Sequence, residues 1–116
     1  MQVRSIIANL KVDDVDDAGF YADYLGLSVQ EFTLGWVARY TSPETGAHLQ
    51  LVSADATSPQ DSVVSVTVDD VDAAHAEALR RGYDIVRPLN DEAWGVRRFL
   101  VRAPDGNVVN ILQNHA

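Results

Sequence analysis

The sequence predicts an α+β fold made of two βαβββ modules, with helices on the outer face of a mixed sheet. Three observations lead to this prediction. A segment near the N-terminus recurs in the second half of the chain, apolar residues alternate in the strands that flank it, and 116 residues with 47% apolar and 22% charged content are ordinary for one globular domain.

The repeat covers the whole chain. Residues 12–18 read VDDVDDA and residues 68–74 read VDDVDAA, which match at six of seven positions and lie 56 residues apart. Gly26 and Gly82 keep the same offset. We therefore interpret residues 1–116 as a single domain made of two repeats. The repeats are 1–53 and 62–116, and the polar segment 54–61 is the linker between them.

Each repeat is expected to begin with a strand followed by a helix. The predicted elements are strands 6–12 and 63–68 and helices 14–25 and 70–81. Asp14 and Asp70 lie where an N-cap belongs, although the Asp before each is an alternative. Gly26 and Gly82 supply the left-handed residue that ends a helix.

Three further strands complete each repeat. They are predicted at 28–33, 36–41 and 47–52 in the first repeat and at 84–87, 96–102 and 107–112 in the second. Turn sequences, PETG at 43–46 and PDG at 104–106, separate the last two strands of each repeat.

Strand alternation separates two faces of the predicted sheet. In the first strand, one face is wholly apolar and should pack on the helix; its residues are Ile6, Ala8, Leu10 and Val12. The opposite faces mix apolar residues with amides, hydroxyls and one imidazole, from Asn9, His48, Gln50, Ser65, Thr67 and Asn110. Such a face either lines a small-molecule cavity or faces water.

Composition excludes several classes of function. The net charge of −8 argues against nucleic acid and against anionic membrane surfaces, both of which require a basic face. The absence of cysteine excludes disulfides, thiolate catalysis and cysteine-bound metal. With no apolar run long enough for a membrane span, we expect a cytoplasmic protein.

In this order and spacing, several motifs resemble the vicinal oxygen chelate superfamily, which includes glyoxalase I, extradiol dioxygenases and fosfomycin and bleomycin resistance proteins. They are the paired βαβββ repeat, FY at 20–21 followed by LGL at 25–27, and RAPDGN at 102–107. EAWGVRRF at 92–99 looks most like the bleomycin-resistance branch. The resemblance implies a curved mixed sheet around a central cavity, and a homodimer.

The resemblance also implies four positions that hold a divalent metal in the superfamily's enzymes, where His and Glu are usual. The matching positions here are Ile7, Gln50, Val63 and Asn110. Ile and Val have no lone pair, and neutral amides are weak ligands for a transition metal. We therefore predict no metal, no cofactor and no catalytic residue.

These considerations favour a metal-free protein that binds a small organic ligand, such as an aromatic or cationic antibiotic-like molecule. The expected ligand-binding residues are Trp36, Tyr40, His48, Gln50, Trp94, Phe99 and Asn110. The alternative is a glyoxalase-like lyase or dioxygenase with a non-standard site, in which His48 would be the base. His75 and His115 are expected on a helix and at the C-terminus. A regulatory partner domain is a third possibility that no motif favours.

Overall fold

The computed structural model describes residues 1–115 and has the predicted α+β class. The chain divides into two compact units. Ile7–Thr57 form the N-terminal unit, and Met1–Ile6 together with the residues from Ser58 onward form the C-terminal unit. The elements are β1 Val3–Lys11, η1 Phe20–Tyr24, β2 Val29–Thr33, β3 Val37–Thr41, β4 His48–Val52, β5 Val64–Val68, α1 Val71–Arg80, β6 Asp84–Asp91, β7 Val96–Arg102 and β8 Val108–Asn114.

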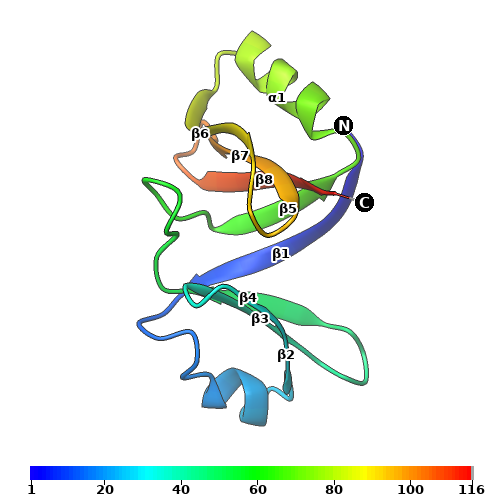
Figure 1. Cartoon of the computed structure of the whole chain (residues 1–116), viewed down its shortest axis with the longest axis vertical. Coiled ribbons are helices and arrows are strands. Elements are labelled where there is room, and N and C mark those ends of the chain that lie inside the picture. Colours follow the sequence, from blue (N-terminus) through cyan, green and yellow to red (C-terminus); the bar gives the residue numbers. More distant parts are fainter. Residues whose placement is uncertain (116) are drawn as a thin grey trace. The chain divides into compact units, whose positions relative to one another are not determined.

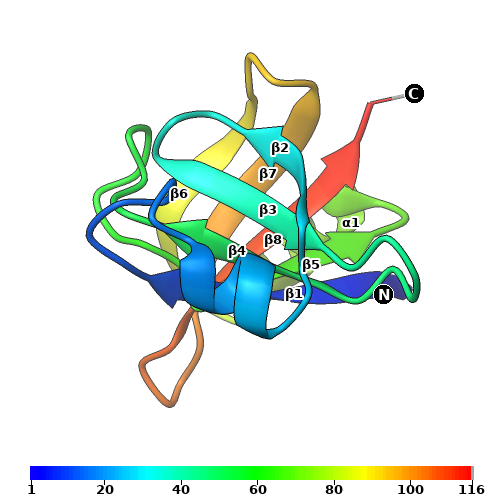
Figure 2. The same ribbon diagram turned by 90° about the horizontal axis from the view of Figure 1, so that it is seen from below.

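The strands of the N-terminal unit follow the order β2-β3-β4-β1. β1 runs parallel to β4, whereas the β2–β3 and β3–β4 pairs are antiparallel, so the sheet is mixed. The short helical segment η1 lies on one side of these strands (Figures 1 and 2). The sheet of this unit therefore has one face toward η1 and one face opposite to it.

The C-terminal unit repeats this plan with the order β5-β8-β7-β6. β5 runs parallel to β8, and the β8–β7 and β7–β6 pairs are antiparallel. α1 covers one side of the four strands (Figure 1). The predicted duplication of a strand, a helical segment and three strands is therefore confirmed in both units.

The second predicted helix is confirmed almost residue for residue. The carboxylate of Asp70 accepts a hydrogen bond from the Ala73 amide at 3.0 Å, which is the N-cap interaction predicted from the sequence. Gly82 follows the helix with φ of 73°, a conformation that strongly favours glycine. Cap and terminator thus define the ten-residue α1.

The first predicted helix is wrong. In place of residues 14–25 only the five-residue π-helix η1 forms, and Gly19 at its N-cap offers no side chain. Asp14 instead accepts from the Asp16 amide at 2.9 Å, a local turn that competes with helix formation. Gly19 adds about 1 kcal/mol against a continuous helix at that position.

Each unit has its own apolar core on the helix side of its sheet. In the N-terminal unit the buried cluster consists of Val15, Ala18, Leu27, Ala38, Tyr40 and Leu51. In the C-terminal unit it consists of Val68, Val71, Ala74, Ala78, Phe99 and Val101. Both clusters draw on alternate strand residues, which confirms the predicted assignment of faces in β4, β5 and β8.

In the first strand the alternation is right and the burial is wrong. Asn9 pairs with Gln50 and Leu10 with Leu51, so the two faces are as predicted. Ile6 and Leu10 are nevertheless exposed, whereas Ile7 on the opposite face is buried. No residue of η1 is buried, so this segment leaves the helix side of the sheet largely uncovered near Leu10.

Other boundaries shift modestly. β6 continues to Asp91 rather than ending at residue 87, and β8 continues to Asn114. Residues 54–61 contain neither helix nor strand. Among the described residues, no helix is long and apolar enough to cross a membrane.

Candidate functional site

On the face of the N-terminal sheet opposite η1, a polar network is centred on Gln50. Its carbonyl Oε1 accepts hydrogen bonds from Arg39 Nε at 3.2 Å and from Arg39 Nη2 at 3.1 Å. Its Nε2 donates to Asn9 Oδ1 at 2.8 Å. These three residues lie on adjacent strands and are register partners, so one row across the sheet holds the whole network. Both ends of the buried Gln50 amide are therefore satisfied.

The guanidinium of Arg39 is held from a second side by Phe32, whose ring centroid lies 5.5 Å from Arg39 Cζ. This is a cation–π contact between partners on β2 and β3. Arg39 Nη1 approaches Glu31 Oε1 at 3.5 Å, beyond the usual range of a strong hydrogen bond. Arg39 is about one-third exposed, which leaves its outer edge accessible.

On the corresponding face of the C-terminal unit lies a buried polar pair. Asn110 Nδ2 donates to Ser65 Oγ at 3.0 Å, and the two residues are register partners on β8 and β5. Asn110 Oδ1 is buried and has no hydrogen-bond partner within the described part of the chain. A buried acceptor without a donor is costly, so this atom is suited to a donor from a ligand or water.

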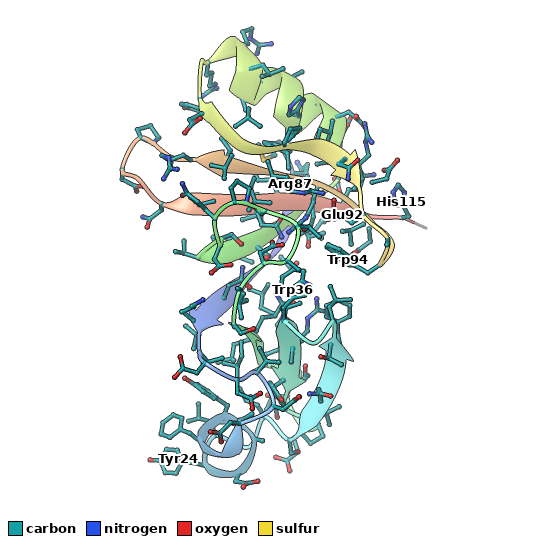
Figure 3. The ribbon with its side chains drawn as sticks, turned by 60° about the vertical axis from the view of Figure 1, so that its left-hand side comes forward. Tyr24, Trp36, Arg87, Glu92, Trp94 and His115 are labelled. Carbon is teal, nitrogen blue, oxygen red and sulfur yellow. The ribbon has the colours of Figure 1, made fainter. Side chains whose placement is uncertain are left out.

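A charged cluster also lies in the C-terminal unit. Glu92 is buried and accepts from Arg87 Nη2 at 2.5 Å and from Asn90 Nδ2 at 2.9 Å, and Arg98 Nη2 lies 3.4 Å from its second oxygen. The Arg98 guanidinium lies 5.1 Å from the Trp94 ring centroid. Arg87, Glu92 and Trp94 gather in one region of the unit (Figure 3).

This cluster sets the ionisation of Glu92. Burial opposes its charge, but the hydrogen bonds from Arg87 and Asn90 and the nearby Arg98 outweigh that effect and hold the pKa of Glu92 below its usual value. Glu92 is therefore an anion that fixes two guanidinium groups. Of this group, only Trp94 was predicted as a site residue. The signal available in the sequence was the five charged residues between positions 87 and 98, which are Arg87, Asp91, Glu92, Arg97 and Arg98.

Two of the residues expected to bind ligand lie on the helix side of their sheets. Tyr40 is buried in the N-terminal core, where its hydroxyl donates to Val15 O at 2.7 Å and accepts from Gln30 Nε2 at 3.0 Å. Phe99 is fully buried beneath α1, with its ring centroid 5.0 Å from that of His75. Both side chains stabilise the core, and neither shares the face of Gln50 or Asn110.

The remaining expected residues have mixed positions. His48 pairs with Thr41, two residues from Gln50 on the same face, but it is exposed, and its Nδ1 lies 3.0 Å from Gly46 O. Trp36 is half-buried just before β3, and its carbonyl accepts from the Ser53 amide. The register thus places Gln50 and His48 on the same face of the N-terminal sheet. Asn110 lies on the corresponding face of the C-terminal sheet.

The family model described as the Glyoxalase/Bleomycin resistance protein/Dioxygenase superfamily matches residues 7–111. The chain belongs to this superfamily. The bleomycin-resistance branch suggested by residues 92–99 stays a prediction. A search of curated proteins found no significant match.

Three solved structures place this glyoxalase/bleomycin resistance-type chain among similar folds. A superfamily member from Vibrio splendidus 12B01 has a TM-score of 0.72 and 20% identity, with 97% of this chain and 100% of that chain covered. An NAD-dependent benzaldehyde dehydrogenase structure from Legionella pneumophila has a TM-score of 0.73 and 19% identity, covering 95% and 99%. An uncharacterized protein from Methanosarcina mazei has a TM-score of 0.67 and 25% identity, covering 98% and 94%. At these identities the first two similarities concern the fold alone.

The residues at the superfamily's metal positions do not fit a transition metal. Ile7 and Val63 offer hydrocarbon, and the one carbonyl oxygen of Gln50 is engaged by a guanidinium cation. Only Asn110 Oδ1 remains as a donor, and one neutral amide is a poor ligand set. Among the described residues, no group of three or more His, Asp or Glu side chains is placed to hold a metal elsewhere.

Proposed function

We propose that this member of the glyoxalase/bleomycin resistance superfamily binds a small organic ligand without a catalytic metal. The observation that carries the proposal is the pair of hydrogen bonds from Arg39 to Gln50 Oε1, which places a fixed positive charge at an inherited metal position. A divalent cation beside that guanidinium would be repelled, and Arg39 would have to give up both bonds.

A binding role is supported by the polar groups on the sheet faces opposite η1 and α1. Asn110 Oδ1 is a buried acceptor without a partner, and a ligand hydroxyl or amine group can satisfy it. Trp94 and Trp36 are half-buried rings of the kind that stack on flat ligands. Arg39 argues against a cationic group beside Gln50, so the ligand that we propose is aromatic and antibiotic-like rather than cationic.

Elemental analysis and ligand screening test this function. Protein purified without chelators should carry no stoichiometric Ni, Zn, Fe or Mn. A panel of flat aromatic molecules should contain compounds that raise the melting temperature and change tryptophan fluorescence, because a ligand that binds the folded state stabilises it. Stoichiometric metal, or a panel without any such compound, would contradict the proposal.

The enzyme alternative makes a different prediction. A glyoxalase-like lyase or dioxygenase would need His48 as its base, and His48 is exposed with a ring nitrogen against Gly46 O. Turnover of methylglyoxal with glutathione that responds to added metal would favour that alternative over a binding protein.

We also propose that the protein is a cytoplasmic homodimer. The absence of cysteine suits a reducing compartment, and the dimer follows from the family resemblance. Sedimentation or light scattering at micromolar concentration should give twice the 12.7 kDa mass of the chain, and a monomeric mass would contradict the dimer.

A further inference from the structure

The charges of the N-terminal unit are segregated. Residues 7–57 contain eight acids and only two bases, Lys11 and Arg39. Asn9 pairs with Gln50, which pairs with Arg39, and Lys11 pairs with Val52 in the same alternation. Because directly paired residues on neighbouring strands point to the same side of a sheet, both bases of the unit share the face of Gln50.

The acids lie elsewhere in the unit. None of them belongs to β1, β3 or β4. Seven lie in loops or in η1, namely Asp13, Asp14, Asp16, Asp17, Asp23, Glu44 and Asp55, and Glu31 lies in the edge strand β2. Both bases of an acidic unit therefore lie on the face of Gln50, and the acid nearest to Arg39 there is Glu31 of the edge strand.

From this face we infer that the ligand of the proposed function carries an anionic group, a carboxylate or a chemically similar oxyanion, and that Arg39 binds it. The inference rests on the proposed function and adds the charge of the ligand. The two edges of the guanidinium have different hydrogen-bond partners. The Nε and Nη2 donors engage Gln50 Oε1, whereas Nη1 has only Glu31 at 3.5 Å among the described residues.

Glu31 is a weak competitor for that edge. Its side chain is 46% exposed, and an exposed ion pair at such a distance contributes little. A ligand carboxylate can accept from Nη1 and Nη2 together, which is the two-bond geometry that guanidinium favours. Phe32 beneath the guanidinium and Gln50 beside it already fix its orientation, so little side-chain entropy is lost when the anion binds.

Matched probes with one ring system and three charges test the inference. We would titrate the full chain with 2-naphthoate, 2-naphthamide and 2-naphthylmethylammonium, and follow binding by calorimetry and by melting temperature. The naphthoate should bind about tenfold more tightly than the amide, since charge-assisted hydrogen bonds are roughly twice as strong as neutral ones. Its affinity should fall as salt is added, because salt screens a partly exposed charge.

Two substitutions localise the effect. Arg39→Gln should remove the preference for naphthoate, leaving naphthoate and naphthamide within about twofold of each other. Arg97→Gln is the control, because Arg97 is similarly exposed, at 31% against 35% for Arg39, but bonds to Asp72 at the start of α1 on the opposite side of its sheet. That variant should bind naphthoate like the wild type. The far-ultraviolet spectrum and melting curve of each variant check that it is folded.

The outcomes separate the inference from the proposed function. If all three probes bind equally, or if Arg39→Gln binds naphthoate as the wild type does, the protein binds small molecules but the anionic class is wrong. If the ammonium probe binds most tightly, a cationic ligand replaces the anionic one. If none of the probes binds at millimolar concentration, both the inference and the proposed aromatic-ligand function are overturned.

Discussion

Arg39 and Gln50 face each other across β3 and β4, and the guanidinium gives two hydrogen bonds to one carbonyl oxygen. At this position, which the family resemblance implies for a metal ligand, the chain places a guanidinium cation. These two hydrogen bonds also satisfy the carbonyl oxygen of the buried Gln50 amide.

Metal should consequently be irrelevant to stability. Treatment with EDTA, or addition of Ni²⁺, Zn²⁺ or Mn²⁺, should leave the melting temperature unchanged, because an ion that does not bind the folded state cannot stabilise it. Differential scanning calorimetry checks this. A rise in melting temperature with increasing concentration of one metal would show that a site exists.

The Tyr40 hydroxyl should matter for stability and not for ligand binding. Tyr40→Phe leaves the carbonyl of Val15 without its donor in the core and should lower the free energy of unfolding by about 1–2 kcal/mol. Urea denaturation measures the loss. Ligand affinity should stay at the wild-type value. Weakened binding with unchanged stability would mean that Tyr40 contacts the ligand.

The pair formed by Ser65 and Asn110 should be strongly coupled. Ser65→Ala removes the acceptor of the buried Asn110 amide and should cost about 1–3 kcal/mol of unfolding free energy. A double-mutant cycle with Asn110→Ala should recover a coupling energy of at least about 0.5 kcal/mol. Additive losses would mean that the hydrogen bond contributes nothing to stability.

Glu92 should make stability depend on acid pH. Its folded-state pKa is lowered because Arg87, Asn90 and Arg98 outweigh the effect of burial, so its contribution is complete above the ordinary glutamate pKa of about 4.3. The contribution is lost as pH falls through the lower folded-state pKa. Glu92→Gln should cost about 3 kcal/mol at pH 7, because it leaves two guanidinium groups around a neutral amide.

The measurement is urea denaturation of wild type and variant at a series of pH values from neutral to strongly acid. The difference between the two proteins should shrink steadily once the pH drops below that ordinary value. A difference that stays constant with pH would rule out an ionised Glu92 as its source.

The two capping aspartates should behave differently. Asp70→Ala removes the N-cap of α1 and should cost about 1 kcal/mol. Asp14→Ala is the matched change in the other unit and should stay within about 0.5 kcal/mol, because Asp14 closes an exposed turn rather than capping a helix. Equal losses would mean that residues 14–25 form a helix in solution.

Most of the fold could be predicted because two local signals agree. Alternation in 47–52 and 107–112 set the faces of β4 and β8, and Asp70 with Gly82 set both ends of α1. The first helix could not be predicted correctly, because its apolar spacing resembles that of α1. Gly19 is the one sequence signal against a continuous helix there, whereas the competing Asp14 turn becomes visible only in the backbone geometry.

The faces of the strands could be predicted from the sequence, whereas the ligand-binding role of the expected residues stays a prediction. Strand alternation placed Gln50 and Asn110 correctly, since that depends only on the period of a strand. Tyr40 and Phe99 were chosen for their aromatic rings and not for their parity within β3 and β7, and the structure places both on the helix side of their sheets. The role of Arg39 depends on Gln50, its partner on the neighbouring strand. The sequence does not tell which residues of two strands lie opposite each other, so this pair could not be predicted.

The contrast between η1 and α1 has a consequence for how the protein opens. η1 buries no residue and has no side-chain cap, whereas α1 buries Val71, Ala74 and Ala78 and is capped. Segments with few buried contacts unfold locally at lower free energy than the rest of a domain. Backbone amides of residues 20–25 should therefore exchange with deuterium before those of α1. The helical segment of the N-terminal unit would then open before the helix of the C-terminal unit, although the two units share one strand order.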